Sequence, residues 1–169
     1  QPTAGNGTFG SVPFDVEGQE ASDERLRPHA ESVLVSEDYF RALGVPLLAG
    51  RMLTIEDDER SEPVTLVNRP FEAAHFPSGT AVGRRVSTDG GETWRTIVGV
   101  VGNMRAADLA REEGPKLYMS FREAPARSIS LLVKSAGNPD ELGKAITAAV
   151  HSMDPRQAVE RIRTLEQIQ

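Results

Sequence analysis

The sequence predicts an α+β fold in which mixed β-sheets pack against a few helices. Two observations support this prediction. Residues 84–101 have the pattern of a β-hairpin, with two strand-like segments joined by Asp-Gly-Gly-Glu. Residues 139–153 have the spacing of an amphipathic helix, with apolar side chains recurring every three or four positions. A chain of 169 residues is long enough for one domain or for two small lobes.

The N-terminal part of the chain is expected to begin irregularly and then to enter a strand. Residues 1–11 are rich in Gly, Thr and Asn, which predicts a flexible entry segment. Phe14 and Val16 alternate with polar neighbours, a weak indication of a strand, and residues 17–28 have the polar, acidic composition of a loop. The segment His29–Val35 is then predicted to be a strand.

A two-turn helix is expected to follow this strand. Ser36 is the predicted N-cap, because its hydroxyl can accept an amide proton from the first turn, where Glu37 and Asp38 would favour the helix dipole. Gly44 is expected to end the helix in a left-handed conformation. A helix this short needs to bury its apolar face. That face consists of Tyr39, Phe40 and Leu43.

The middle of the chain is predicted to alternate between strands and short helices. Residues 45–53 contain a break at Gly50-Arg51 and lead into a charged loop that ends at Glu62. Pro63–Val67 is a short apolar strand, and Pro70–Phe76 is a helix with proline in its first turn.

The hairpin joins Arg84–Thr88 to Thr93–Val101. Its second strand has apolar side chains on both faces, which predicts an interior strand. Gly99 within it suggests a β-bulge or a close backbone approach. The side chains that we expect to be mostly buried are Ile97, Val98, Val100 and Val101.

Further strands are predicted at Lys116–Phe121, Ser128–Lys134 and Ala158–Arg163. The helix at 139–153 is expected to be capped by Asn138, and its stripe, which includes Leu142, Ile146 and Val150, is expected to pack on a sheet. Residues 164–167 have capping-box spacing. That pattern predicts the start of a helix, as if the sequence had been cut there.

Composition excludes several classes of function. The chain has no cysteine, which removes disulfides, thiolate metal ligands and thiol catalysis. Residues 1–62 hold 13 acidic and 5 basic side chains, and the rest of the chain is nearly balanced, so no basic patch suggests nucleic-acid binding. No apolar run is long enough to cross a bilayer.

The search for catalytic, cofactor-binding and metal-binding residues is negative. His29, His75 and His151 lie far apart in the sequence, so structural roles are favoured over a metal site. The acidic run Glu56–Glu59 lacks the pattern of a calcium loop and is expected to be a solvated loop. Gly99-x-x-Gly102 is too short a pattern for a phosphate site. The aromatic residues expected in the core rather than in a ligand pocket are Tyr39, Phe40, Phe76, Trp94 and Tyr118.

Several sequence segments, in the right order, resemble the MacB-like periplasmic core domain of FtsX-like ABC transporter permeases. The resemblance covers most of residues 12–168. It rests on VSEDYFRALGVPLLAGR at 35–51, VTLVN at 64–68, FP at 76–77, VGRRV at 82–86, WRTIVGVVG at 94–102, KLYMSF at 116–121 and the strand-and-helix stretch at 130–154. Two departures are Asn68-Arg69-Pro70, where the family often has a different helix start, and Ser120, where it usually has proline.

The resemblance implies a two-lobed extracytoplasmic domain. Residues 1–48 and 117–169 would form a membrane-proximal, porter-like lobe, and residues 49–116 would form an inserted, sabre-like lobe. The implied location is the inner membrane, with the domain facing the periplasm. The implied partners are the permease's own transmembrane helices, the cytoplasmic ABC ATPase, and either a periplasmic adaptor or a second permease copy; nucleic acid is not among them.

The resemblance also implies a function. The domain would couple ATP-driven motion of the membrane helices to export or to partner proteins, with no enzymatic activity and no cofactor. A periplasmic module that captures a ligand or peptide directly is the alternative, and a pocket with convergent polar groups would favour it. An enzyme of unrecognised type is a third reading, which a cleft with strongly perturbed carboxylates would support.

Overall fold

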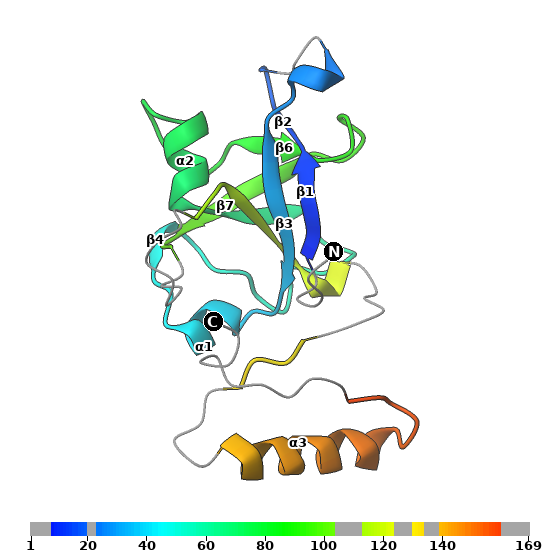
Figure 1. Cartoon of the computed structure of the whole chain (residues 1–169). Coiled ribbons are helices and arrows are strands. Elements are labelled where there is room, and N and C mark those ends of the chain that lie inside the picture. The colour runs from blue at the N-terminus through cyan, green and yellow to red at the C-terminus, as the bar shows by residue number, and fades with distance from the viewer. Residues whose placement is uncertain (1–7, 20–22, 104–112, 124–129, 134–138, 160–169) are drawn as a thin grey trace.

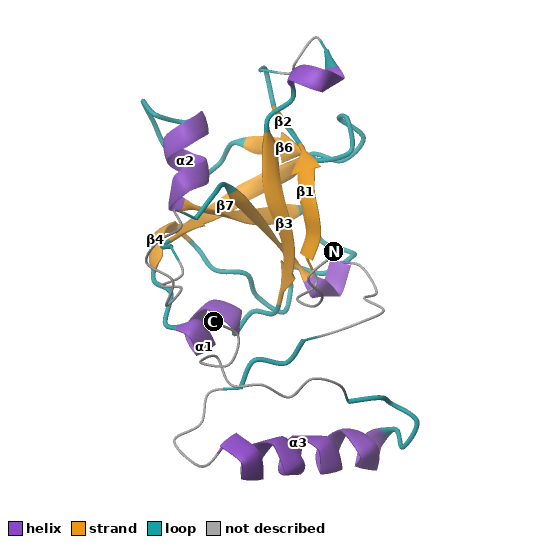
Figure 2. Cartoon of the chain, in the orientation of Figure 1, coloured by secondary structure: helices purple, strands orange, loops and turns teal. Residues whose placement is uncertain are grey.

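The strands of this computed structural model form one mixed sheet (Figures 1 and 2). The structure describes residues 8–19, 23–103, 113–123, 130–133 and 139–159. The strands are β1 (Thr8–Pro13), β2 (Asp15–Val16), β3 (His29–Val35), β4 (Leu47–Gly50), β5 (Val64–Asn68), β6 (Arg85–Ser87), β7 (Arg95–Val101) and β8 (Lys116–Ser120). The helices are α1 (Tyr39–Leu43), α2 (Arg69–His75) and α3 (Pro139–Met153), with 3₁₀ turns at Glu24–Leu26 and Phe121–Glu123.

The strand order in the sheet is β1-β3-β8-β5-β7-β6-β2. β4 lies off this path and pairs with β7. Two neighbouring pairs are parallel, β3 with β8 and β5 with β7. The other pairs are antiparallel. β8 comes late in the chain but lies between β3 and β5. The sheet therefore joins distant parts of the sequence through backbone hydrogen bonds.

Elements with strong local signals are found where the sequence predicts them. β3 spans His29–Val35 as expected, and the hairpin of β6 and β7 forms around Gly90 and Gly91, whose φ angles are 78° and 91°. β7 has partners on both sides and is an interior strand. Of its expected buried residues, Ile97, Val100 and Val101 are fully buried and Val98 is partly buried.

The first helix is shorter than predicted and begins later. The N-cap is Asp38, not Ser36, and its side chain makes no capping hydrogen bond. The Ser36 carbonyl instead accepts a hydrogen bond from the Tyr39 amide, which makes residues 36–39 a turn. Glu37 and Asp38 therefore precede the helix. Gly44 ends it with φ of 70°, as predicted. The helix is held by Phe40, which is 2% exposed.

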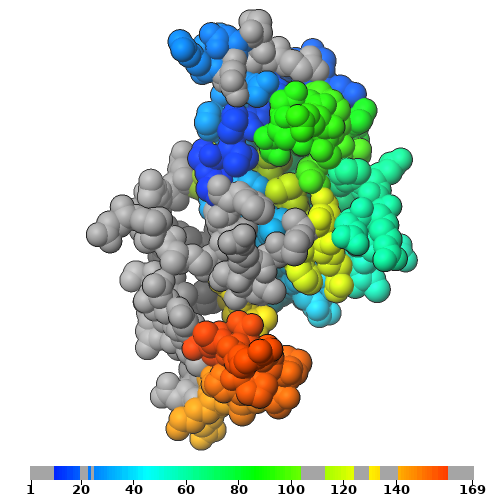
Figure 3. All heavy atoms as spheres, turned by 90° about the vertical axis from the view of Figure 1, so that its right-hand side faces the viewer, coloured from blue at the N-terminus to red at the C-terminus, as the bar shows by residue number. Residues whose placement is uncertain are grey.

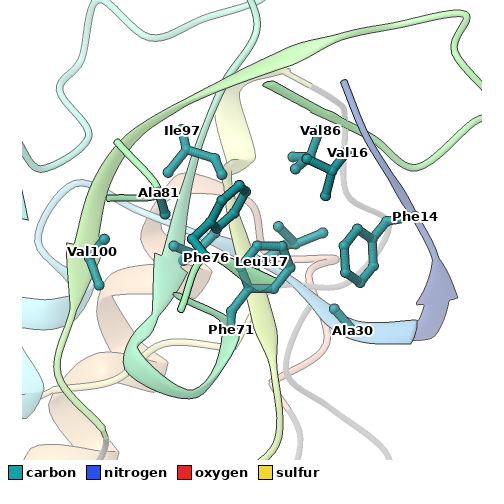
Figure 4. Packing of buried hydrophobic residues seen from close by; sticks show 11 residues of the cluster. Phe14, Val16, Ala30, Phe71, Phe76, Ala81, Val86, Ile97, Val100 and Leu117 are labelled. Carbon is teal, nitrogen blue, oxygen red and sulfur yellow. The ribbon is translucent and has the colours of Figure 1, made fainter. Parts of the chain in front are cut away.

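Two apolar clusters account for the core. One is built around β2, α2 and β7, where the Phe14 and Phe71 rings lie 4.9 Å apart (Figure 4). The other joins α1 to β3, β5 and β8, where Phe40 meets Tyr118 edge to face at 4.9 Å. The two clusters together contain residues of β2, β3, β5, β6, β7 and β8, so these strands share their apolar packing.

The flexible segment predicted at residues 1–11 is wrong at residues 8–11, and residues 1–7 lie outside the described residues. Thr8–Pro13 is β1, which pairs with β3 in an antiparallel register with a bulge near Gly10. The Gly-rich composition is accommodated because Gly10 adopts a φ of 79° at that irregularity. The pairing partner is about twenty residues away, so local composition could not reveal it.

The strand predicted at Ser128–Lys134 is wrong within residues 130–133, which form no strand and leave Leu131 67% exposed. The rest of that segment lies outside the described residues. Ala158 and Val159 are likewise not in a strand, and 160–163 lie outside the description. Asn138 and the capping-box pattern at 164–167 also lie outside it.

α3 forms as predicted, but its stripe does not join either core cluster. The helix lies at one end of the molecule, away from the sheet (Figures 1 and 3). Leu142, Ile146 and Val150 are only half-buried, and Met153 is 80% exposed. The expected packing on a sheet is therefore wrong, because an amphipathic pattern identifies an apolar face without specifying what covers it. No helix in the described ranges combines the length and apolar character of a membrane span.

The sheet runs across the boundaries of the two lobes that the sequence resemblance implies. Strands from 1–48 and 117–169 share it with strands from 49–116, because β8 pairs with β5 and β2 with β6. The observed fold class is a mixed sheet with few helices.

Candidate functional site

The residues that most resemble catalytic or metal-binding groups are not gathered into a common site. His75 packs against Phe14 and Phe71, with ring centroids 4.9 Å from each, and burial lowers its pKa. His151 is exposed on α3, and His29 is exposed at the start of β3. No group of three or more His, Asp or Glu side chains in the described ranges is placed to hold a metal ion.

A shallow cleft of about 380 Å³ lies where β1 and β3 meet the start of β8. Its lining residues are Gly10, Ser11, His29, Ala30, Glu31, Gly114 and Pro115. The Ser11 hydroxyl lies 3.4 Å from His29 Nδ1, which is long for a hydrogen bond between these groups. Glu31 forms an ion pair with Lys116. The cleft thus offers a few polar groups, and its carboxylate is engaged elsewhere.

Lys116 is the centre of a small charge cluster beside this cleft. Its ammonium lies 3.1 Å from a carboxylate oxygen of Glu31 and 3.1 Å from one of Glu113. Burial by itself would lower the pKa of Lys116, but hydrogen bonds and the charges of the two carboxylates outweigh it, so the pKa lies above its ordinary value. A lysine held in this charged form is suited to a structural ion pair rather than to nucleophilic catalysis.

The aromatic residues lie mostly in the core, as predicted. Phe40, Phe76 and Tyr118 are buried, whereas Tyr39 and Trp94 are half-buried. The Tyr118 hydroxyl is buried and has no hydrogen-bond partner among the residues that the structure describes. Burial raises the pKa of Tyr118 far above its ordinary value, so the group remains protonated in the folded protein.

Asn68 links α2 to the start of β8. Its side-chain oxygen accepts hydrogen bonds from the amides of Phe71 (3.2 Å) and Lys116 (2.9 Å), and its amide group donates to the Gly114 carbonyl (2.8 Å). Asn68 is fully buried, and its bond to the Phe71 amide is buried too, whereas the bonds to Lys116 and Gly114 are partly buried. The residue caps α2 and fixes one side of the wall of the cleft at Gly114.

A tightly held loop follows β4, and no sequence pattern indicates the contacts that hold it. Arg51 donates from both terminal nitrogens to the two oxygens of Asp57, each at 2.8 Å. The same carboxylate accepts from the Thr54 amide at 2.7 Å and the Thr54 hydroxyl at 3.1 Å. The hydrogen bond from Arg51, together with that from the Thr54 amide, outweighs burial and lowers the pKa of Asp57.

The expectation that Glu56–Glu59 is a purely solvated loop is therefore wrong at Asp57, which is 4% exposed. We call residues 51–62 the clasped loop. No spacing rule identifies Asp57 as the buried member of the run, because its partner Arg51 lies six positions earlier and pairs through the fold.

Comparison with known families matches residues 9–149 to the MacB-like periplasmic core domain. No curated protein matches. The periplasmic region of MacB from Actinobacillus actinomycetemcomitans is 20% identical, with a TM-score of 0.64 over 88% of this chain and 64% of that chain. A domain assigned to a permease protein from Porphyromonas gingivalis is 15% identical, with a TM-score of 0.59 over 92% of this chain and 64% of that one.

This chain thus spans 64% of the length of both solved structures. At such low identities the two structures support the fold, and the family assignment rests on the match over residues 9–149. The match includes β3, α1, the hairpin and most of α3, which are the segments on which the sequence resemblance rests. The chain belongs to the family of MacB-like periplasmic core domains.

Proposed function

We propose that this chain is the extracytoplasmic domain of an ABC transporter permease of the inner membrane. It transmits ATP-driven movement of the membrane helices to export or to partner proteins, and it has no catalytic activity of its own. The observation that carries the proposal is the continuous sheet, in which β8 holds β3 and β5 together. A body joined in this way moves as a unit when one part of it is displaced.

Backbone hydrogen bonds and packed side chains would carry the displacement. The parallel pair of β3 and β8 is continued by β5 and β7, and apolar clusters cover the sheet. Asn68 couples α2 to β8. Coupling of this kind requires only that the domain makes different contacts in two states of the transporter.

The partners and the lobe division belong to this proposal. The domain would act with the permease's own membrane helices, with the cytoplasmic ABC ATPase, and with a periplasmic adaptor or a second permease copy. Residues 1–48 and 117–169 would be the membrane-proximal part, and residues 49–116 would be the inserted part. The sheet that spans both would keep their relative movement small.

Spin labels on the intact permease test the proposal. The chain has no cysteine, so exposed positions can be labelled through Ser36→Cys and Glu92→Cys without competing sites in this domain. These positions lie in the two proposed lobes. In the transporter with its ATPase, we expect the distance between the two labels to stay constant through the ATP cycle. The distance from either label to one on a membrane helix should change.

Two results would refute the proposal. One is a domain that keeps its position relative to the membrane helices while transport proceeds. The other is a large change between the labels at 36 and 92, which would show that the domain deforms instead of moving as a unit. The unlabelled transporter and each singly labelled variant serve as controls for activity.

Direct ligand capture is the alternative function, and the cleft beside β1 favours it. Its polar groups are His29, Ser11 and Glu31. If the domain captures a ligand there, a Glu31→Gln permease should bind candidate substrates more weakly than the wild-type permease does. Equal binding by both would count against capture in this cleft.

A further inference from the structure

The clasped loop presents an exposed apolar side chain on a rigid support. Ile55 is 63% exposed, although it lies only two residues from the buried Asp57. β4 runs directly into this loop and adds two more exposed side chains, Leu47 at 37% and Leu48 at 48%. A single exposed apolar side chain usually needs no explanation. Three large ones within residues 47–55 suggest a contact surface.

The loop is organised before any partner binds. Asp57 receives four hydrogen bonds, from both arms of Arg51 and from the amide and hydroxyl of Thr54. Further along, Asp58 receives hydrogen bonds from the Arg60 amide and, at its carbonyl, from the Ser61 hydroxyl. A loop fixed in this way loses little conformational entropy on binding, which favours affinity.

The loop that carries the exposed Ile55 is acidic. Residues 51–62 carry five acidic and two basic side chains, and the clasp neutralises Asp57 with Arg51. Glu56 and Glu59 are exposed, Glu62 is exposed at the end of the loop, and Asp58 is half-buried. Exposed carboxylates thus follow the exposed Ile55 along the loop, with the exposed Arg60 among them. We call Glu56, Glu59 and Glu62 the acidic border, because an interface core is commonly flanked by a polar rim.

We propose that the clasped loop, together with β4, is a docking surface for a partner protein. The partner segment presents apolar side chains interleaved with lysine or arginine. Ile55 and Leu48 supply the apolar contact, and Glu56 and Glu59 attract the basic side chains and fix the register. Arg51 and Asp57 are positioning residues, because they hold the loop and do not touch the partner.

The acidic border argues against two other occupants. An anionic lipid surface would repel Glu56 and Glu59, although Ile55 is apolar enough to insert. A second copy docked through the same loop would bring two acidic borders together, and like charges at an interface are unfavourable. Charge complementarity therefore favours a basic partner.

The test uses the intact permease in nanodiscs of neutral lipid, without ATP. The probe is a fluorescent peptide of alternating leucine and lysine, and the matched probe has glutamate in place of lysine. We expect the lysine peptide to bind, and we expect Ile55→Ser to weaken its binding about tenfold or more. Leu26→Ser is the control, because Leu26 is 73% exposed and lies outside this surface. It should leave binding unchanged.

Substitutions in the acidic border and at Asp57 test the same peptide binding independently of Ile55. Glu56→Gln with Glu59→Gln should weaken binding and reduce its dependence on salt concentration. Asp57→Asn should weaken peptide binding although Ile55 and the acidic border remain. As a control for folding, the melting temperatures of the Ile55→Ser and Leu26→Ser variants should match that of the wild-type permease.

The proposal is overturned if the lysine peptide does not bind, if Ile55→Ser and Leu26→Ser bind it equally, or if the glutamate peptide binds as well. Ile55-dependent binding to anionic vesicles would assign the surface to a membrane, and an Ile55-dependent increase in sedimentation mass would assign it to a second copy. Because no ATP is present, failure here leaves the proposed ATP-driven movement untouched, and the spin-label test leaves this surface untouched.

Discussion

Gly50 of β4 lies opposite Gly99 of β7, and neither position has room for a side chain. A Cβ on Gly50 would lie 2.1 Å from the Val98 carbonyl oxygen, and one on Gly99 would lie 2.3 Å from the Arg51 carbonyl oxygen. The register of β5 against β7 also shifts immediately before Gly99, because Val98 is skipped between the pairs at Ile97 and Gly99. The sequence-based expectation of a bulge or a close approach at Gly99 is confirmed on both counts.

Gly99→Ala should destabilise the protein by about 2 kcal/mol or more, because the obstructing atom is backbone and cannot rotate away. The free energy of unfolding, measured by urea denaturation, tests this. Gly79→Ala is the matched control, since nothing lies within 4 Å of a Cβ there. Equal midpoints for the two variants would contradict the close approach.

Asn68→Ala should destabilise the protein by about 2–4 kcal/mol. The substitution leaves the amides of Phe71 and Lys116 and the carbonyl of Gly114 without their buried partner. Asn68→Asp should also destabilise, because it replaces the donor to Gly114 with an acceptor. Thermal unfolding of both variants provides the measurement, and a stable Asn68→Asp protein would argue against the bond to Gly114.

Asp57 should make the protein sensitive to acid. Its folded-state pKa lies below the ordinary value of 3.8, so the unfolded chain binds the proton more tightly. The resulting stabilisation is present above that value and is lost as the pH falls through the lower, folded-state pKa. We expect the Asp57→Asn variant to lose less stability on acidification than the wild-type protein does. Urea denaturation midpoints at neutral and acidic pH measure this loss. Glu92→Gln, at an exposed hairpin position, should retain the wild-type acid response.

The two tyrosines should resist ionisation in the folded protein. Burial raises the pKa of Tyr39 and of Tyr118 above the ordinary value of 10.0. Folding favours the neutral form of both side chains, so their contribution to stability is retained below pH 10.0. Above that pH the unfolded chain ionises first, and the free energy of unfolding falls. Absorbance of tyrosinate should therefore appear near pH 10.0 in denaturant and at higher pH in the native protein. Coincident titrations would refute the burial of both hydroxyls.

A charge on α3 should be tolerated better than a charge in the sheet. Val150 is half-buried and belongs to neither core cluster, whereas Val100 is fully buried in β7. Val100→Asp should lower the free energy of unfolding by several kcal/mol, about the penalty for a buried unpaired charge, and Val150→Asp by much less. Similar losses for the two variants would mean that the stripe of α3 is packed after all.

Local patterns were sufficient where one segment carries its own signal. β3, the hairpin and α3 follow from alternation, turn residues and helical periodicity, which act over a few neighbouring residues. β1 was missed because a Gly-rich segment becomes a strand only when β3 offers it an edge. The position of α3 was missed for a related reason, since its stripe does not specify a partner.

The candidate surfaces were less predictable than the fold. Ser36 is of a residue type preferred at the N-cap, but the chain makes a turn there and the helix begins at Tyr39. The clasp depends on Arg51 and Asp57 meeting across a loop whose path is set by the glycine contact before it. Neither the cleft beside β1 nor the exposure of Ile55 can be read from a run of residues, because both follow from long-range pairing.

The position of β8 in the sheet also determines how late in synthesis the sheet can be completed. The first 115 residues contain β3 and β5, but the strand that hydrogen-bonds between them is Lys116–Ser120. While the chain emerges, the edges of β3 and β5 that face each other in the finished sheet remain open, and open edges invite pairing with other chains. The sheet therefore cannot close before residue 120 has been made, and until then these two edges are available for pairing with other chains.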